Sequence, residues 1–128
     1  MVGKSVFVID SQKDRYPYYA VSRVVICGAE ADLLSEIAYF GLPCIVIPGT
    51  TAKDDYRWIN AGVVEMQGWG FRVGQRAGIG QTINRNVKKA LEDNAVFEKM
   101  SRKALDHAPF NAAARITGII YEEVLKRN

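Results

Sequence analysis

The sequence is poor in cysteine and histidine, two of the residues from which many protein metal sites are built. It has two cysteines, Cys27 and Cys44, and one histidine, His107, and no CxxC or Cys/His spacing typical of zinc binding. Both cysteines lie beside or inside apolar runs, which favours buried free thiols in a reducing cytosol. We therefore predict no metal site.

Long apolar runs and dense basic runs are missing as well. No apolar run approaches the roughly 18 residues of a membrane-spanning helix, and no basic-then-apolar leader is recognisable. The 17 lysines and arginines are scattered among 14 acids and leave a net charge of +3. This scattered pattern argues against a nucleic-acid partner. We expect a cytoplasmic chain whose membrane contact is peripheral or made through a partner.

The length of the chain allows one folding unit. Its 128 residues, 48% of them hydrophobic, suffice for one core and are too few for two independent ones. No internal repeat, low-complexity tract or linker divides the sequence. We predict a single domain over residues 1–128.

Three apolar runs, at residues 5–9, 23–27 and 43–48, are rich in valine and isoleucine and nearly continuous. Such runs are typical of parallel strands that are covered on both faces. The segments between them carry helical spacing, so strands and helices alternate as in right-handed βαβ units. A fourth strand is expected at Val63–Met66, and the glycine-rich segment 67–80 is interpreted as a loop.

Helical patterns continue to the end of the chain after residue 80. The fold class is therefore α/β: a Rossmann-like, three-layer parallel sheet of about four strands with a helical carboxyl-terminal part. Such sheets bind ligands at the carboxyl ends of their strands. The predicted sheet has fewer strand–helix units than a complete Rossmann half. This favours an incomplete half, or an open sheet edge that a partner or a homodimer covers.

The loop GAEA at residues 28–31 follows the second predicted strand. It leads into a helix whose first N–H groups are available to an anion. Glu36 follows about one helical turn later, and its two carboxylate oxygens can each accept one hydroxyl of a ribose. We interpret the stretch as a nucleotide site; the alternative is that Glu36 is a solvated helix acid.

The order of strand, small-residue loop, SEIAYFGLP and IVIP resembles the carboxyl-terminal half of GT-B sugar-nucleotide enzymes, most closely glycosyltransferase family 28. The resemblance implies a sheet half that binds the UDP of a sugar donor, with no cofactor besides this UDP-sugar substrate. It places Glu36 on the ribose hydroxyls. It places the loop near the pyrophosphate, through Gly28, Ala29, Glu30 and Ala31.

The stretch GTTAKDDYRWINAG at 49–62 is similar to UDP-N-acetylglucosamine 2-epimerases as well. On this resemblance the sugar side of the site consists of Thr50, Thr51, Tyr56 and Arg57. Tyr56 and Arg57 stand where family 28 transferases carry a glutamine pair, so the sugar itself is not predicted.

Two acids depart from the family pattern. Glu30 and Asp32 stand where the family's loop carries paired glycines or Ser-Gly. They would repel a pyrophosphate unless Lys53, Arg57 or a partner compensates them. The same acids stabilise the N-terminus of an unliganded helix by about 0.3 to 1 kcal/mol each.

The resemblance predicts the UDP-sugar-binding portion of a glycosyltransferase that transfers a hexose or N-acetylhexosamine. The acceptor would come from a missing domain, a partner domain or a separate subunit. We assign no catalytic residue and expect no transferase activity from this chain alone. Two alternatives stay open: a UDP-sugar hydrolase or 2-epimerase on the same scaffold, and a non-catalytic Rossmann-like module for protein contact.

Overall fold

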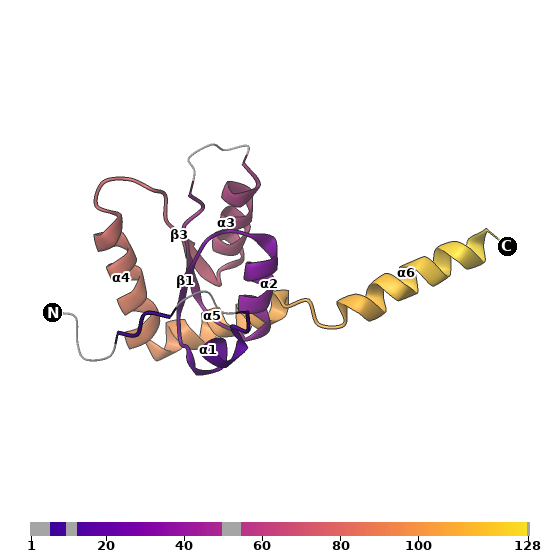
Figure 1. Cartoon of the computed structure of the whole chain (residues 1–128), viewed down its shortest axis with the longest axis horizontal. Helices are drawn as coiled ribbons and strands as arrows, with labels where there is room; N and C mark the ends of the chain where they lie inside the picture. Colours follow the sequence, from indigo (N-terminus) through magenta and orange to yellow (C-terminus); the bar gives the residue numbers. More distant parts are fainter. Residues whose placement is uncertain (1–5, 10–12, 50–54, 128) are drawn as a thin grey trace.

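The computed structural model describes residues 6–9, 13–49 and 55–127. Within these residues three strands form one parallel sheet in the order β1-β2-β3. Helices alternate with the strands and then follow them (Figure 1). The elements are α1 (Tyr16–Val21), β1 (Val25–Cys27), α2 (Ala31–Tyr39), β2 (Cys44–Val46), α3 (Tyr56–Gln67), β3 (Gly70–Arg72), α4 (Ile79–Glu92), α5 (Asn94–His107) and α6 (Ala112–Lys126).

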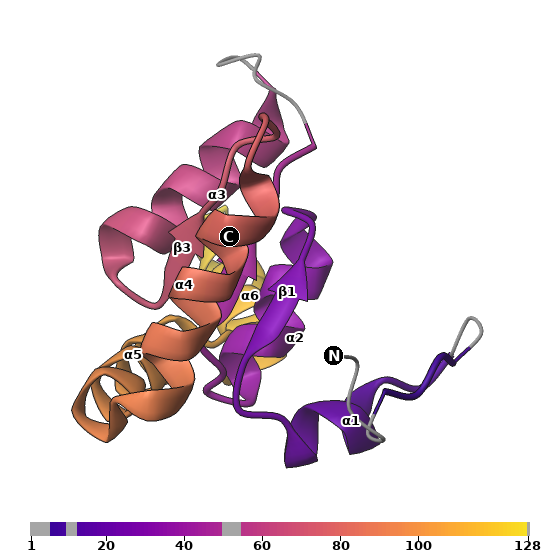
Figure 2. The same ribbon diagram turned by 90° about the vertical axis from the view of Figure 1, so that its left-hand side faces the viewer.

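The core has three layers around β2, the central strand. Cys44 and Val46 of β2 are buried in one cluster with Leu34 of α2 and Val64 of α3. Alternate strand residues point to opposite faces, so Ile45, which is fully buried, faces the other side, where α4 contacts β2. Helix α5 contacts both α2 and α4 and closes one end of the core (Figure 2). The predicted α/β class with a parallel sheet is confirmed.

The fourth strand predicted at Val63–Met66 is wrong, because these residues belong to α3. Ala61 and Val64 are both buried and three residues apart, the spacing of one helix face. Helix α3 ends only at Gly68, whose φ of 82° suits a residue without Cβ.

The strand that follows α3 is β3, inside the segment interpreted as a loop. A Cβ on Gly70 would lie 2.8 Å from both the carbonyl oxygen and the sulfur of Cys44. Glycine is therefore the residue that lets β3 approach β2. Gly70 is one of the glycines that indicate a loop in the sequence, and in the structure it makes a close strand contact.

The strand predicted at residues 5–9 is also wrong for the part that the structure describes. Residues 6–9 lie outside the sheet and their side chains are exposed. A strand of a doubly covered sheet needs cover for its apolar faces, and the exposed side chains of residues 6–9 have none among the described residues. The described sheet therefore has three strands, and Ile26 on its edge strand β1 is 51% exposed.

The helical carboxyl-terminal part is confirmed. Asp93 caps α5 by accepting a hydrogen bond from the N–H of Val96 at 3.1 Å. Helix α6 projects away from the rest of the chain, and all its residues are exposed (Figure 1). Among the described residues, no helix is long and apolar enough to cross a membrane.

Candidate functional site

The loop between β1 and α2 lies at the carboxyl edge of the sheet and is held from two sides. Ala29 is fully buried, and its carbonyl accepts a hydrogen bond from Nδ2 of Asn60 on α3 at 2.9 Å. The carbonyl of Glu30, the N-cap residue, accepts the N–H of Leu34 at 3.0 Å and begins α2. The first N–H groups of α2 are therefore presented from a well-anchored loop.

Negative charge covers this loop. The Glu30 side chain folds back over Gly28 so closely that a Cβ on the glycine would collide with Oε2 of Glu30. Asp32 adds a second carboxylate in the first turn of α2. These acids complement the positive end of the helix dipole. An incoming anion would meet them before it met the backbone N–H groups.

Glu36 lies in the second turn of α2, and its carboxylate is directed at α1. Nη2 of Arg15 lies 3.0 Å from Oε1 and 3.0 Å from Oε2. The Tyr19 hydroxyl donates to Oε2 at 3.2 Å. A carboxylate has about four acceptor positions, so some capacity remains for a further donor. The Glu36 side chain is 25% exposed and can be reached by one.

These contacts change the proton affinities of both partners. The hydrogen bond to Glu36 is the main reason why the pKa of Arg15 is raised. The pKa of the Tyr19 hydroxyl is raised chiefly by burial, with the positive charge of Arg15 acting against it. Tyr19 therefore stays a protonated donor to Glu36 at neutral pH.

Glu36 borders two surface hollows. One, of about 310 Å³, is lined by Arg15 and Tyr16 together with the residues before them. The other, of about 350 Å³, is lined by Tyr16, Tyr39 and Phe40. Tyr39 and Phe40 follow Glu36 at the far end of α2 from the loop, and the rings of Tyr16 and Phe40 are 5.7 Å apart. A flat group bound beside Glu36 would therefore meet aromatic side chains.

Arg57 lies on the predicted sugar side, in the first turn of α3. Its Nε and Nη2 each lie 3.1 Å from a carboxylate oxygen of Asp55, which also caps the helix by accepting the Arg57 N–H at 2.8 Å. These hydrogen bonds lower the pKa of Asp55 and raise that of Arg57. A Cβ on Gly49 would lie 3.8 Å from Nη1 of Arg57, which puts the guanidinium beside the segment that leaves β2.

The predicted residues divide into two groups in the structure. The 28–31 loop and Arg57 share the carboxyl edge, and Glu30 contributes to the raised pKa of Arg57. Glu36 faces α1 instead. Tyr56 is exposed. Thr50, Thr51 and Lys53 lie outside the described residues.

Three residues of this region, Arg15, Tyr19 and Asn60, lie outside the site predicted from the sequence. Arg15 and Tyr19 precede Glu36 by 21 and 17 positions, and no local spacing links them to it. Only the tyrosine-rich composition of the 16–19 stretch marks this segment in the sequence.

The two cysteines are free thiols on neighbouring strands. Cys44 is buried, and a hydrogen bond with Cys27 together with burial raises its pKa. Burial of Cys44 agrees with the expectation from the sequence, whereas Cys27 is only half-buried.

The comparison with protein families and the comparison with curated relatives agree with each other. Residues 6–116 match the description "Glycosyltransferase family 28 C-terminal domain". Two relatives carry the name UDP-N-acetylglucosamine--N-acetylmuramyl-(pentapeptide) pyrophosphoryl-undecaprenol N-acetylglucosamine transferase. The relative from Geobacter sulfurreducens is 30% identical over 108 residues, which are 84% of this chain and 29% of the relative. The one from Shewanella frigidimarina is 30% identical over 115 residues, 90% of this chain and 31% of the relative.

The fold has a counterpart among solved structures. The crystal structure of Acinetobacter baumannii MurG superimposes with a TM-score of 0.76 at 24% sequence identity. The match covers 91% of this chain and 33% of that one. The chain thus spans about a third of the length of the proteins it matches.

Proposed function

We propose that this chain, which belongs to glycosyltransferase family 28 and matches its carboxyl-terminal domain, holds the UDP of a sugar donor. The donor would supply a hexose or N-acetylhexosamine for transfer. The observation that carries this proposal is the sequence of loop, helix and carboxylate after β1. The loop presents the first N–H groups of α2 at the edge where parallel sheets bind ligands. Glu36 follows on the same helix, with an accessible carboxylate that is directed at α1.

In this proposal Glu36 accepts the ribose hydroxyls. Arg15 and Tyr19 hold its carboxylate in one orientation, which lowers the entropy lost when the ribose binds. They also occupy part of its acceptor capacity, so the ribose shares the carboxylate with them. The Gly28–Ala31 loop meets the pyrophosphate, and Arg57 offsets the charge of Glu30.

The part of the proposed sugar side that the structure describes lies in the first turn of α3. Arg57 already satisfies Asp55 with two nitrogens, and Nη1 is the guanidinium nitrogen closest to Gly49. A diphosphate or a sugar hydroxyl at this edge can be met by that nitrogen. Thr50, Thr51 and Tyr56 complete the proposed set.

The acceptor is proposed to come from another domain or subunit. The chain spans about a third of its relatives. Ile26 on the edge strand β1 is 51% exposed, and the apolar residues of α6 between Ile116 and Leu125 are more than half exposed. We propose that a partner domain covers these surfaces and supplies the catalytic groups; a second copy of the chain is the alternative.

One observation favours the second candidate, a non-catalytic contact module. The carboxylate of Glu30 lies over Gly28, where a donor pyrophosphate would bind. If this carboxylate does not move, the loop rejects diphosphates. The two candidates differ in a single measurable property, the binding of UDP.

Calorimetric titration of UDP into the wild type and Glu36→Gln tests the proposal. A neutral amide keeps the shape but replaces a charged acceptor, so we expect UDP to bind about 1 to 1.5 kcal/mol more weakly. UDP lacking both ribose hydroxyls should bind the two proteins equally. Glu122→Gln, an equivalent change on exposed α6, should leave UDP binding unchanged.

Two results would count against the proposal. If the wild type does not bind UDP at millimolar concentration, the contact module becomes the better explanation. If Glu36→Gln weakens both ligands equally, the carboxylate supports the helix and does not hold the ribose.

A further inference from the structure

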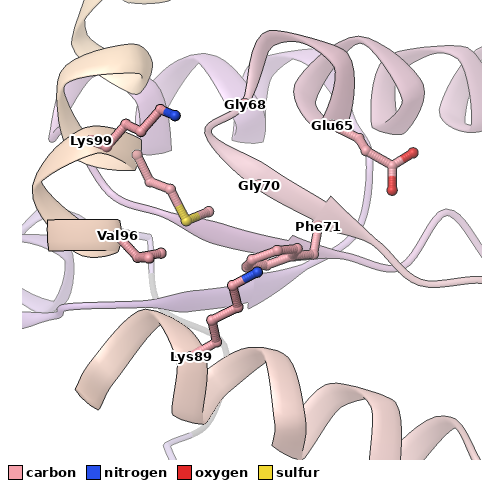
Figure 3. A pocket seen from close by; sticks show the side chains of 8 residues that line it. Glu65, Gly68, Gly70, Phe71, Lys89, Val96 and Lys99 are labelled. Atoms are coloured by element: carbon pink, nitrogen blue, oxygen red, sulfur yellow. The ribbon is translucent and has the colours of Figure 1, made fainter. Parts of the chain in front are cut away.

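Another pocket lies at the opposite end of the sheet from the Gly28–Ala31 loop. It has a volume of about 350 Å³ and includes Gly68 and Gly70, at the amino-terminal end of β3. Side chains from α3, β3, α4 and α5 surround it (Figure 3). We call it the lysine pocket. The residues that matter for the argument are Glu65, Phe71, Lys89, Val96, Lys99 and Met100.

The lysine pocket has an apolar interior. Met100 is buried, with 6% of its surface exposed, and Phe71 and Val96 are half-buried. These side chains come from β3 and α5, so packing of the fold itself holds them in place. A flat apolar group bound here would exchange water for ring and thioether contacts.

Positive charge borders this interior. Lys89 reaches in from α4, with Nζ 5.7 Å from the centre of the Phe71 ring, and Lys99 comes from α5 (Figure 3). Among the described residues, neither ammonium group lies within 4.0 Å of a carboxylate oxygen. Both lysines are exposed and keep their charge available to a ligand.

The one acid of the lysine pocket is already neutralised. Oε2 of Glu65 lies 3.1 Å from Nη2 of Arg72, whose guanidinium also lies over the Trp58 ring at 4.6 Å. Figure 3 shows the Glu65 carboxylate directed away from the two lysines. The pocket therefore combines an apolar floor with a net positive rim.

We propose that the lysine pocket binds a small molecule in which an aromatic or flat apolar body carries one anionic group, a carboxylate or a phosphate. The body packs on Phe71, Val96 and Met100, and the anion lies between Lys89 and Lys99. This site is separate from the donor site, because it lies at the amino-terminal end of β3 while the Gly28–Ala31 loop follows the carboxyl end of β1. The lysine pocket can bind such a molecule whether or not the chain binds UDP.

Naphthoate is a suitable probe, and methyl-labelled methionine NMR is a suitable readout. The chain has three methionines. Met100 lines the lysine pocket, whereas Met66 is 81% exposed and does not. We expect naphthoate to shift the Met100 methyl signal in a saturable manner and to leave the Met66 signal nearly unchanged.

Charge variants test the anion contact. Lys89→Gln and Lys99→Gln should each weaken naphthoate by about two- to fivefold, the range of exposed ion pairs. Lys88→Gln removes the same charge from an exposed position of α4 outside the pocket and should have no effect. Neutral naphthamide should bind the wild type more weakly than naphthoate does.

The proposal is overturned by a Met100 signal that does not shift at millimolar naphthoate, or by equal affinities of naphthoate and naphthamide. An equal loss in Lys88→Gln would likewise show that only net charge matters. The Met100 signal without ligand checks that each variant keeps the native pocket.

Discussion

Neutralising Glu30 should strengthen diphosphate binding, if the 28–31 loop is the pyrophosphate site. Glu30 has its carboxylate over Gly28. At about 6 Å in water, repulsion between this carboxylate and one phosphate charge is about 0.7 kcal/mol, and about 1.5 kcal/mol for a diphosphate with two charges. We expect Glu30→Gln to bind UDP about tenfold more tightly at low salt.

The same substitution should lower stability, which separates the two roles of the acid. Glu30 faces the positive end of α2, so its neutralisation should cost about 0.3 to 1 kcal/mol of the free energy of unfolding. Urea unfolding measures this loss, and calorimetry measures the gain in UDP affinity. Glutamine keeps the length of the side chain, so packing changes little.

Uridine and salt provide the controls. Uridine carries no phosphate, so its affinity should not change in Glu30→Gln. At about 1 M salt the Debye length falls to about 3 Å, so the gain for UDP should largely disappear. An unchanged UDP affinity at low salt, or an equal gain for uridine, would show that the Glu30 carboxylate does not repel the diphosphate.

Two further predictions concern stability. Arg57 lowers the pKa of Asp55. The ionised carboxylate therefore stabilises the fold above its ordinary pKa of about 4, and this contribution is lost as the pH falls through the lower pKa of the folded state. Urea unfolding should show that Asp55→Asn differs from the wild type near neutral pH and much less in strong acid; a constant difference would contradict this. Gly70→Ala would place a Cβ 2.8 Å from the Cys44 carbonyl oxygen and should cost about 1 to 3 kcal/mol or more. Gly80 is the second residue of α4, and a Cβ there meets nothing within 4 Å, so Gly80→Ala should be neutral or stabilise by up to about 0.5 kcal/mol. Equal effects of the two substitutions on urea unfolding would show that the strand contact is not tight.

The pattern of apolar residues along the sequence predicted β1, β2 and the start of α2, because each of these depends mainly on which residues of one segment are buried. The runs at 23–27 and 43–48 are nearly continuous in branched apolar residues, and β1 and β2 lie inside them. The loop at 28–31 and the start of α2 follow from the change to small residues and helical spacing. Parallel pairing of the two strands follows because a helix connects them.

The strand predicted at Val63–Met66 and the loop predicted over β3 were both wrong, because the prediction relied on the propensities of valine and glycine. The valines at Val63–Met66 have strand propensity, yet Ala61 and Val64 bury one face of a helix. Gly70 has no strand propensity, yet its missing side chain is what allows contact with Cys44. Propensity is local, whereas the fit of a backbone against its neighbour is decided only when the layers pack.

The sequence by itself determined that Glu36 lies in a helix that follows a small-residue loop. This is so because the position of a residue along a helix depends only on its neighbours in the sequence. Tertiary structure alone decided what the Glu36 carboxylate contacts. Arg15 and Tyr19 reach it across 21 and 17 positions, and Lys89 and Lys99 border one pocket because α4 packs on α5. Such contacts depend on how separate elements are oriented, which no spacing along the chain records.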